Sequence, residues 1–318
     1  MITLEVVYWA MGLLAGGVAM INARDPVNPR RYNNAAFWGL YAVTFLFGSR
    51  LPNFASGCVV IAMVLVASVG KLGQGAGESV SRAMREMSAR AWGNRLFIPG
   101  LTIPVVTLAG TFLLKGAQVN GTMLVDQKQI TLISLGLATF IALVVGMLML
   151  RPPVLAPLHE ARRLWDAVGW AAILPQMLAA LGALFATAGV GTVVTGLAER
   201  WLPIGSPLAA VAAYTVGMAL FTMIMGNAFA AFPVMTAGIG LPLIMTRFGG
   251  NVTVMAAVGM LSGFCGTLMT PMAANFNIVP AALLELPDEY AVIKAQLPTA
   301  ILLLLANTVI MYLLVYRH

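Results

Sequence analysis

Long apolar runs, separated by short polar stretches, dominate the hydropathy pattern of this chain. A helix needs about 20 mostly apolar residues to cross a bilayer, and the pattern predicts about ten such spans. We therefore expect an all-α polytopic membrane protein. The predicted spans are 3–22, 35–50, 53–70, 97–114, 130–150, 168–187, 206–225, 229–246, 252–270 and 297–315.

Two polar interruptions break the apolar region between Tyr214 and Pro280. The first, 225–229, reads Met-Gly-Asn-Ala-Phe, and Pro233 follows it. The second, 263–271, reads Gly-Phe-Cys-Gly-Thr-Leu-Met-Thr-Pro, and two asparagines come soon after it. Helix breakers and amides at bilayer depth are costly unless the freed backbone groups find partners. Broken helices of this kind indicate the binding site of a secondary transporter.

Composition supports a membrane protein and limits its partners. Hydrophobic residues make up 60% of the 318 residues and charged residues only 9%, which is outside the range of soluble domains. The net charge of +7 comes mainly from loops after the first, third and fifth predicted spans, so we expect no nucleic-acid partner. The positive-inside rule places these loops in the cytoplasm and the N-terminus outside.

The chain is predicted to have two helical bundles. Residues 1–150 form a five-span bundle, 151–167 a proline-containing cytoplasmic linker, and 168–318 a bundle that carries the broken helices. The stretch 189–203 follows a span and holds a helix too short to cross. It is either a re-entrant hairpin or an external loop.

The loop from Gly70 to Trp92 begins with four glycines and continues as a cationic amphipathic helix. This pattern is typical of a segment that lies on the inner membrane face. The Walker pattern that cradles phosphates is absent, so we expect no nucleotide site.

The predicted spans lack the groups of an enzyme. No Asp or Glu lies securely inside a span after the first, and no Ser/His/Asp or HExxH pattern is present. Ionisable groups inside a membrane normally mark proton paths and catalytic sites. Cys58 and Cys265 lie in apolar segments and indicate neither a disulfide framework nor a metal site. We therefore expect no enzyme, no cofactor and no self-contained proton relay.

Neutral polar residues at the two breaks are the candidate solute ligands. The N-terminus of a half-helix presents unpaired N–H groups and a partial positive charge, which can hold a carboxylate without an arginine. Asn and Thr add donors and acceptors, while glycine lets a ligand approach the backbone. Helix packing is the alternative role for such residues. The candidates are Gly226, Asn227, Phe229, Gly266, Thr267, Thr270, Asn275 and Asn277.

The chain resembles a bacterial permease family that was long described as a domain of unknown function. The resemblance rests on Tyr8-Trp9 and on motifs at 23–25, 28–31, 47–52, 226–233 and, most specifically, 263–277. It implies the larger subunit of a 5-oxoproline (pyroglutamate) transporter of the bacterial inner membrane, encoded beside a smaller membrane subunit. The C-terminal half is also loosely similar to the ion transporter superfamily of carboxylate permeases.

The resemblance favours a secondary-transporter subunit for a small carboxylate, with Na⁺ or H⁺ as coupling ion. No convincing second copy of a repeat is found in the chain, which favours assembly with the smaller subunit or as a homo-oligomer. The alternative function is a non-transporting membrane scaffold or regulatory subunit.

Overall fold

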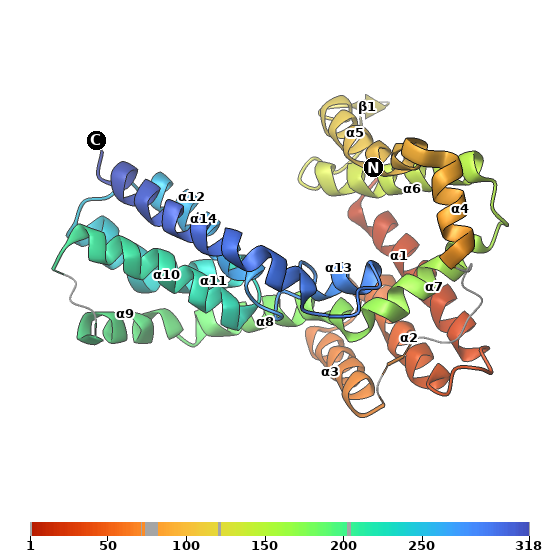
Figure 1. The fold of residues 1–318 in the computed structure, drawn as a ribbon, viewed down its shortest axis with the longest axis horizontal. Coiled ribbons are helices and arrows are strands. Elements are labelled where there is room, and N and C mark those ends of the chain that lie inside the picture. The colour runs from red at the N-terminus through yellow and green to blue at the C-terminus, as the bar shows by residue number, and fades with distance from the viewer. Residues whose placement is uncertain (1, 71, 74–81, 120–121, 202–204, 318) are drawn as a thin grey trace. The chain divides into compact units, whose positions relative to one another are not determined.

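The computed structural model describes residues 2–70, 72–73, 82–119, 122–201 and 205–317 (Figure 1). Most of these residues are helical, and the chain divides into two compact units, residues 1–166 and 167–318. Within the described residues, eight helices are long and apolar enough to cross a membrane. The chain is therefore an apolar helical protein of the multi-pass membrane type.

The described part of the first unit contains seven α-helices, the last of them incompletely, with a short 3₁₀ helix and a small hairpin. They are α1 (Leu4–Ala23), α2 (Arg31–Phe47), α3 (Asn53–Gly70), α4 (Arg82–Trp92), η1 (Gly93–Leu96), α5 (Phe97–Leu113), β1 (Gln118–Val119), β2 (Thr122–Met123), α6 (Ile130–Leu150) and most of α7 (Ala156–Val168).

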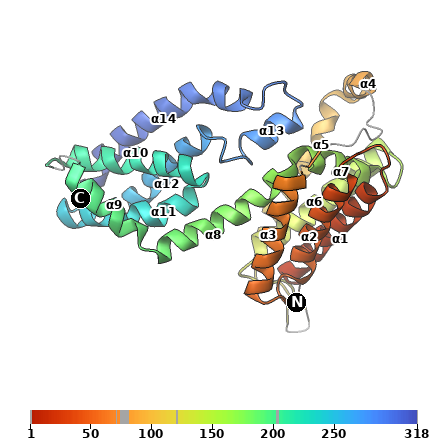
Figure 2. The ribbon, with the colours of Figure 1, turned by 90° about the horizontal axis from the view of Figure 1, so that it is seen from below.

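Helices α1, α2 and α3 lie side by side, and α5 lies along α6 (Figure 2). Small residues bring these helices close together. A Cβ atom on Gly12 of α1 would lie 2.6 Å from the Leu46 side chain of α2. A Cβ atom on Gly110 of α5 would lie 2.8 Å from the Ser134 hydroxyl of α6. Close backbone approach at small residues is the usual way in which membrane helices associate.

The second unit contains the broken helices. Its elements are η2 (Gly169–Ile173), α8 (Leu174–Thr187), α9 (Val190–Trp201), α10 (Pro207–Met225), α11 (Ala228–Met235), the π-helical segment η3 (Thr236–Arg247), α12 (Val252–Leu268), α13 (Ile278–Leu283) and α14 (Ala291–Val315).

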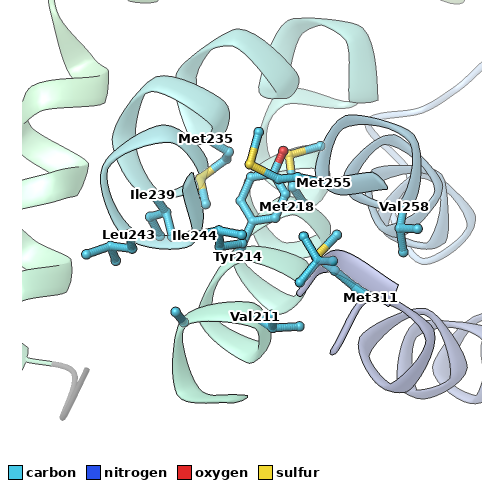
Figure 3. Close-up of a cluster of buried hydrophobic side chains, with 12 residues drawn as sticks. Val211, Tyr214, Met218, Met235, Ile239, Leu243, Ile244, Met255, Val258 and Met311 are labelled. Atoms are coloured by element: carbon cyan, nitrogen blue, oxygen red, sulfur yellow. The ribbon is translucent and has the colours of Figure 1, made fainter. Parts of the chain in front are cut away.

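Helices α10 and α12 pack in the same direction, and Tyr214 lies at the centre of the core that they share with η3 and α14 (Figure 3). The Tyr214 ring fills the space left by Gly259 and Gly240, where added Cβ atoms would lie 2.6 and 3.1 Å from it. Its hydroxyl is 3.0 Å from the hydroxyl of Thr236. Methionines occupy much of the remaining core, where their flexible side chains fill irregular gaps.

The prediction of an all-helical chain with many apolar spans is confirmed for eight helices. The count of ten is not confirmed, because α2 and α12 each have only 17 residues.

The segment 189–203 holds α9, which follows a bend at Gly189 (φ 68°). Residues 202–204 lie outside the described part, and the re-entrant hairpin stays a prediction. In the loop 70–92, residues 71 and 74–81 also lie outside the described part of the chain, whereas residues 82–92 form α4.

Candidate solute site at the helix breaks

The first break separates α10 from α11. Gly226 ends α10 in the left-handed conformation, with φ of 67°, and its N–H donates to the Thr222 carbonyl over 2.7 Å. Asn227 then adopts an extended conformation, and its Oδ1 accepts a hydrogen bond from the N–H of Phe229 over 2.9 Å. Asn227 is therefore the N-cap of α11, the role in which asparagine is among the preferred residues.

The second break follows α12 and is tied to the first. The Thr270 hydroxyl donates to the Met223 carbonyl of α10 over 2.8 Å and accepts from the N–H of Met272 over 3.2 Å. The Asn277 amide nitrogen donates to the carbonyls of Thr267 and Thr270 over 2.8 and 2.7 Å. Because the last four carbonyls of a helix lack intrahelical partners, these side chains satisfy backbone groups that the breaks set free.

Glycine allows the backbones to approach closely at both breaks. A Cβ atom on Gly226 would lie 2.5 Å from the carbonyl oxygen of Met272. A Cβ atom on Gly266 would lie 2.3 Å from the carbonyl oxygen of Ala219. Both neighbours are backbone atoms, so neither can move aside as a flexible side chain would. The two glycines thus serve helix packing in this conformation.

The other predicted site residues lie in different surroundings. Thr267 is buried, and its hydroxyl donates to the Phe264 carbonyl over 2.6 Å. Phe229 is 66% exposed, and its ring centre is 5.8 Å from that of Phe264 in an edge-to-face contact. Asn275 is exposed. The structure thus joins Gly226, Thr267, Thr270 and Asn277 into one buried junction, with Asn227 beside it and Asn275 outside it.

Helix ends of opposite polarity meet at the junction. The N-terminus of α11 carries a partial positive charge, and the C-termini of α10 and α12 carry partial negative charges. At the α11 end, Asn227 uses only its side-chain oxygen in the cap. Its amide nitrogen has no hydrogen-bond partner among the described residues. An anion is favoured at this end, and a cation at the ends of α10 and α12.

Helix α11 continues through the π-helical segment η3, and together they form the apolar span Ala228–Arg247. Pro242 lies inside η3 and has no N–H to donate. Because π-helical hydrogen bonds join residues five positions apart, the carbonyl of Ala237 loses its usual donor. The carbonyl of Gly238, next to it, accepts from the Thr195 hydroxyl of α9 over 2.7 Å, which ties α9 to the backbone of η3.

Within the part of the chain that the structure describes, no group of three or more His, Cys, Asp and Glu residues could hold a metal ion.

The sequence matches the family described as "Protein of unknown function (DUF979)" over residues 5–316. The chain belongs to this family. A search of the curated proteins found no match, and neither did a search of the solved structures.

This DUF979 chain also has a buried polar network in its first unit. Asp166 of α7 is 6% exposed. Its Oδ1 accepts from the Trp38 indole N–H over 2.8 Å and from the Asn22 amide over 3.1 Å. Its Oδ2 lies 3.5 Å from Nε of Arg162. All these partners are donors, so each contact favours the ionised form of the Asp166 carboxyl, whereas its burial opposes that form.

Arg162 joins this carboxylate to Asp25, with which it forms a second ion pair. Burial opposes the ionised form of Asp25, but the hydrogen bonds from Arg162 and from the Val27 N–H, with the charge of Arg162, lower the pKa of the Asp25 carboxyl below its ordinary value. The network therefore contains two carboxylates that share one guanidinium.

Asparagines extend the network to the segment that follows α3. The Asn34 amide donates to the Gly73 carbonyl over 2.7 Å, and its oxygen accepts from the Gly73 N–H over 3.2 Å. Asn28 donates to the same carbonyl over 3.2 Å. These bonds fix the chain at Gly73 against the ends of α1 and α2.

Sequence reasoning missed this network because it assigned residues 151–167 to a solvated linker. One signal was available. Arg162 and Asp166 are four residues apart, which places them on one face of a helix. Asn22 and Asn34 lie at the ends of the first two apolar runs. Which residues these groups contact depends on pairings more than 100 positions apart, and a single sequence does not reveal those.

Proposed function

We propose that this chain is a subunit of a secondary transporter that moves a small carboxylate, 5-oxoproline above all, across the bacterial inner membrane. The observation that carries the proposal is the N-terminus of α11. Asn227 caps it with an oxygen, and among the described residues its amide nitrogen has no hydrogen-bond partner. A helix N-terminus favours an anion, and the amide adds one more donor for a carboxylate or a lactam carbonyl.

Several features of the second unit support a solute site at this place. The break joins two apolar segments, α10 on one side and α11 with η3 on the other, and each is long enough to span the membrane. Phe229, beside the cap, presents a largely exposed ring against which an apolar ring face of a solute packs. Binding by helix ends needs no charged side chain, in keeping with the neutral residues at the junction.

The proposal includes a partner and an orientation. A smaller membrane subunit, or a second copy of this chain, completes the solute path. The basic loops face the cytoplasm and the N-terminus lies outside, because lysine and arginine are enriched in cytoplasmic loops. In this assembly Asn227 and Phe229 contact the solute. The buried residues of the junction, Gly226, Gly266, Thr267, Thr270 and Asn277, hold the two breaks together around it, and Asn275 lies outside the junction.

Replacing Asn227 tests whether the break binds solute or only joins helices. Asn227→Ala is expected to lower uptake of labelled 5-oxoproline by at least about tenfold, since loss of one hydrogen bond to a charged group weakens binding by about 1.5–3 kcal/mol. Uptake is measured in cells that express this chain with the smaller subunit, and the amount of each variant in the membrane is measured in parallel.

Asn251→Ala is the matched control. Asn251 caps α12 and accepts from the N–H groups of Thr253 and Val254 over 2.9 and 3.2 Å, so both variants lose an N-cap worth about 1 kcal/mol. Asn251 lies at the other end of α12 from the break, and its variant should keep uptake. If both variants lose stability equally and neither changes uptake, the scaffold function is favoured instead.

A further inference from the structure

Helix α4 of the first unit is amphipathic, and its apolar side is exposed. Met84, Met87 and Ala91 are three and four positions apart, so they lie on one face of the helix. Ala89, two positions from Ala91, lies on the opposite face. All four side chains are exposed, and Met87 is 62% exposed. Figure 2 shows α4 standing apart from the bundle of α1, α2 and α3.

A helix of this length needs a surface against which its apolar face is buried. Helix α4 has 11 residues, and isolated helices shorter than about 12–15 residues are marginal in water. Packing of the apolar face, more than helix propensity, stabilises such a helix in proteins. Because Met87 and Ala91 are exposed in the described part of the chain, that surface lies outside it.

The place of α4 in the chain brings it to the membrane. Only η1, four residues long, separates it from α5, and α5 belongs to an apolar span. A 3₁₀ helix rises about 2 Å per residue, so α4 ends within about 8 Å of the first residue of α5. This distance is about one Debye length at physiological ionic strength. Phe97, that first residue, is 66% exposed, as expected of a side chain that faces lipid.

The chain changes direction between α4 and α5. Gly93 has a φ of 49°, in the left-handed region, directly after the last residue of α4. A left-handed residue ends a right-handed helix, so α4 does not continue the axis of α5 (Figure 1). The turn lets α4 lie along a membrane surface that α5 crosses.

The charges of this segment favour an anionic surface. Helix α4 contains three arginines and one glutamate, and Arg95 follows in η1. Arg90 and Arg95 are exposed, and guanidinium groups bind phosphate oxygens through paired N–H donors. Trp92 stands at the end of α4, and tryptophan is enriched at membrane–water interfaces. Apolar and basic residues combined in this way are typical of helices that lie in the headgroup region of anionic membranes.

We propose that α4 lies on the inner leaflet of the membrane and binds anionic phospholipids. Met87 and Ala91 enter the boundary between headgroups and acyl chains, and Trp92 lies among the headgroups. Arg90 and Arg95 bind the lipid phosphates. This surface belongs to the first unit, so the inference does not depend on transport of 5-oxoproline by the second.

A pair of labelled variants tests which face of α4 contacts lipid. The full chain carries Cys58→Ser, which removes the exposed thiol, while Cys265 is buried. A fluorophore is attached at Ala91→Cys or, as the matched control, at Ala89→Cys, in liposomes of phosphatidylcholine and phosphatidylglycerol. Nitroxides on the lipid tails should quench position 91 at least about threefold more than position 89, since the helix diameter of about 10 Å separates the two faces in depth. Equal quenching would contradict the proposal.

The dependence on charge is tested with the label at position 91. Arg90→Gln and Arg95→Gln should each lower the ratio of membrane-bound to unbound α4 about fivefold, the factor that corresponds to about 1 kcal/mol per arginine at an anionic surface. Arg50→Gln removes an exposed arginine between α2 and α3 and should leave the ratio unchanged. Liposomes of phosphatidylcholine alone, and about 1 M KCl without any substitution, should weaken the quenching too.

Two outcomes would overturn the proposal. Quenching at position 91 that persists in phosphatidylcholine, in KCl and in both arginine variants would show that α4 does not bind anionic lipid. A label at position 91 that neither the lipid nitroxides nor aqueous acrylamide reaches would show that a protein surface, such as a second copy of this chain, covers the apolar face instead.

Discussion

Arg162→Met is expected to lower the free energy of unfolding by about 3–5 kcal/mol, the usual effect of removing one partner from a buried ion pair. The Arg162 side chain is 11% exposed and contacts both Asp25 and Asp166, which are 8% and 2% exposed at their side chains. Methionine fills much of the same space but leaves two buried carboxylates without a counter-charge. Urea unfolding of the purified protein in detergent, followed by circular dichroism, measures the change.

Arg163→Met is the control on the same helix. The Arg163 guanidinium lies 2.8 Å from the Glu160 carboxylate, but their side chains are 28% and 45% exposed, and such pairs contribute no more than about 1 kcal/mol. Arg162→Lys keeps the positive charge but lacks the several N–H donors of a guanidinium. Its loss of unfolding free energy should lie between those of Arg162→Met and Arg163→Met. Equal losses in Arg162→Met and Arg163→Met would show that the network does not hold the first unit together.

Gly226→Ala is expected to cost about 2–5 kcal/mol of stability and to abolish uptake. A residue with a Cβ loses about 1–2 kcal/mol in the left-handed conformation, which Gly226 adopts with φ of 67°. The new Cβ would also lie 2.5 Å from the Met272 carbonyl oxygen, and overpacking of this kind adds about 1–3 kcal/mol. The same unfolding measurement, together with uptake of labelled 5-oxoproline, tests both effects.

Gly249→Ala separates the two contributions. Gly249 has the same φ of 67°, but an added Cβ would meet no heavy atom within 4 Å. This variant should lose only the backbone contribution of about 1–2 kcal/mol and keep its uptake. A Gly226→Ala variant that is no less stable than Gly249→Ala would contradict the close contact between the two breaks.

The sequence located the two breaks, because their signals are local. Gly226 and Asn227 supply a left-handed end and an N-cap within two residues, and α10 and α11 end and begin there. Pro271 disfavours helix at the residue before it, and α12 ends at Leu268. Local backbone preferences are enough to place such helix ends, so the residues around them were identified as a group.

What the polar residues do at the breaks was not predictable. Thr270 and Asn277 bond to backbone carbonyls, and Thr270 reaches the Met223 carbonyl of another helix, 47 positions earlier in the chain. Asp166 is buried and accepts hydrogen bonds from Asn22 and Trp38, 144 and 128 positions away. Composition shows that a polar residue lies in an apolar region, but only the packing of distant helices shows which of its atoms are used.

The π-helical segment shows the same limit. Residues 236–247 have the composition of an ordinary apolar span, but Gly238 packs against α9 and the segment winds as a π-helix. The last span was predicted to begin at 297, whereas α14 begins at Ala291 and contains Pro298.

Uptake into proteoliposomes tests transport most directly. The full chain and the proposed smaller membrane subunit are purified, reconstituted together and supplied with labelled 5-oxoproline. We predict saturable uptake that unlabelled 5-oxoproline suppresses and that Asn227→Ala reduces by at least about tenfold. Uptake no higher than that of empty liposomes, with both subunits present and folded, would contradict the assignment of this chain to a 5-oxoproline transporter.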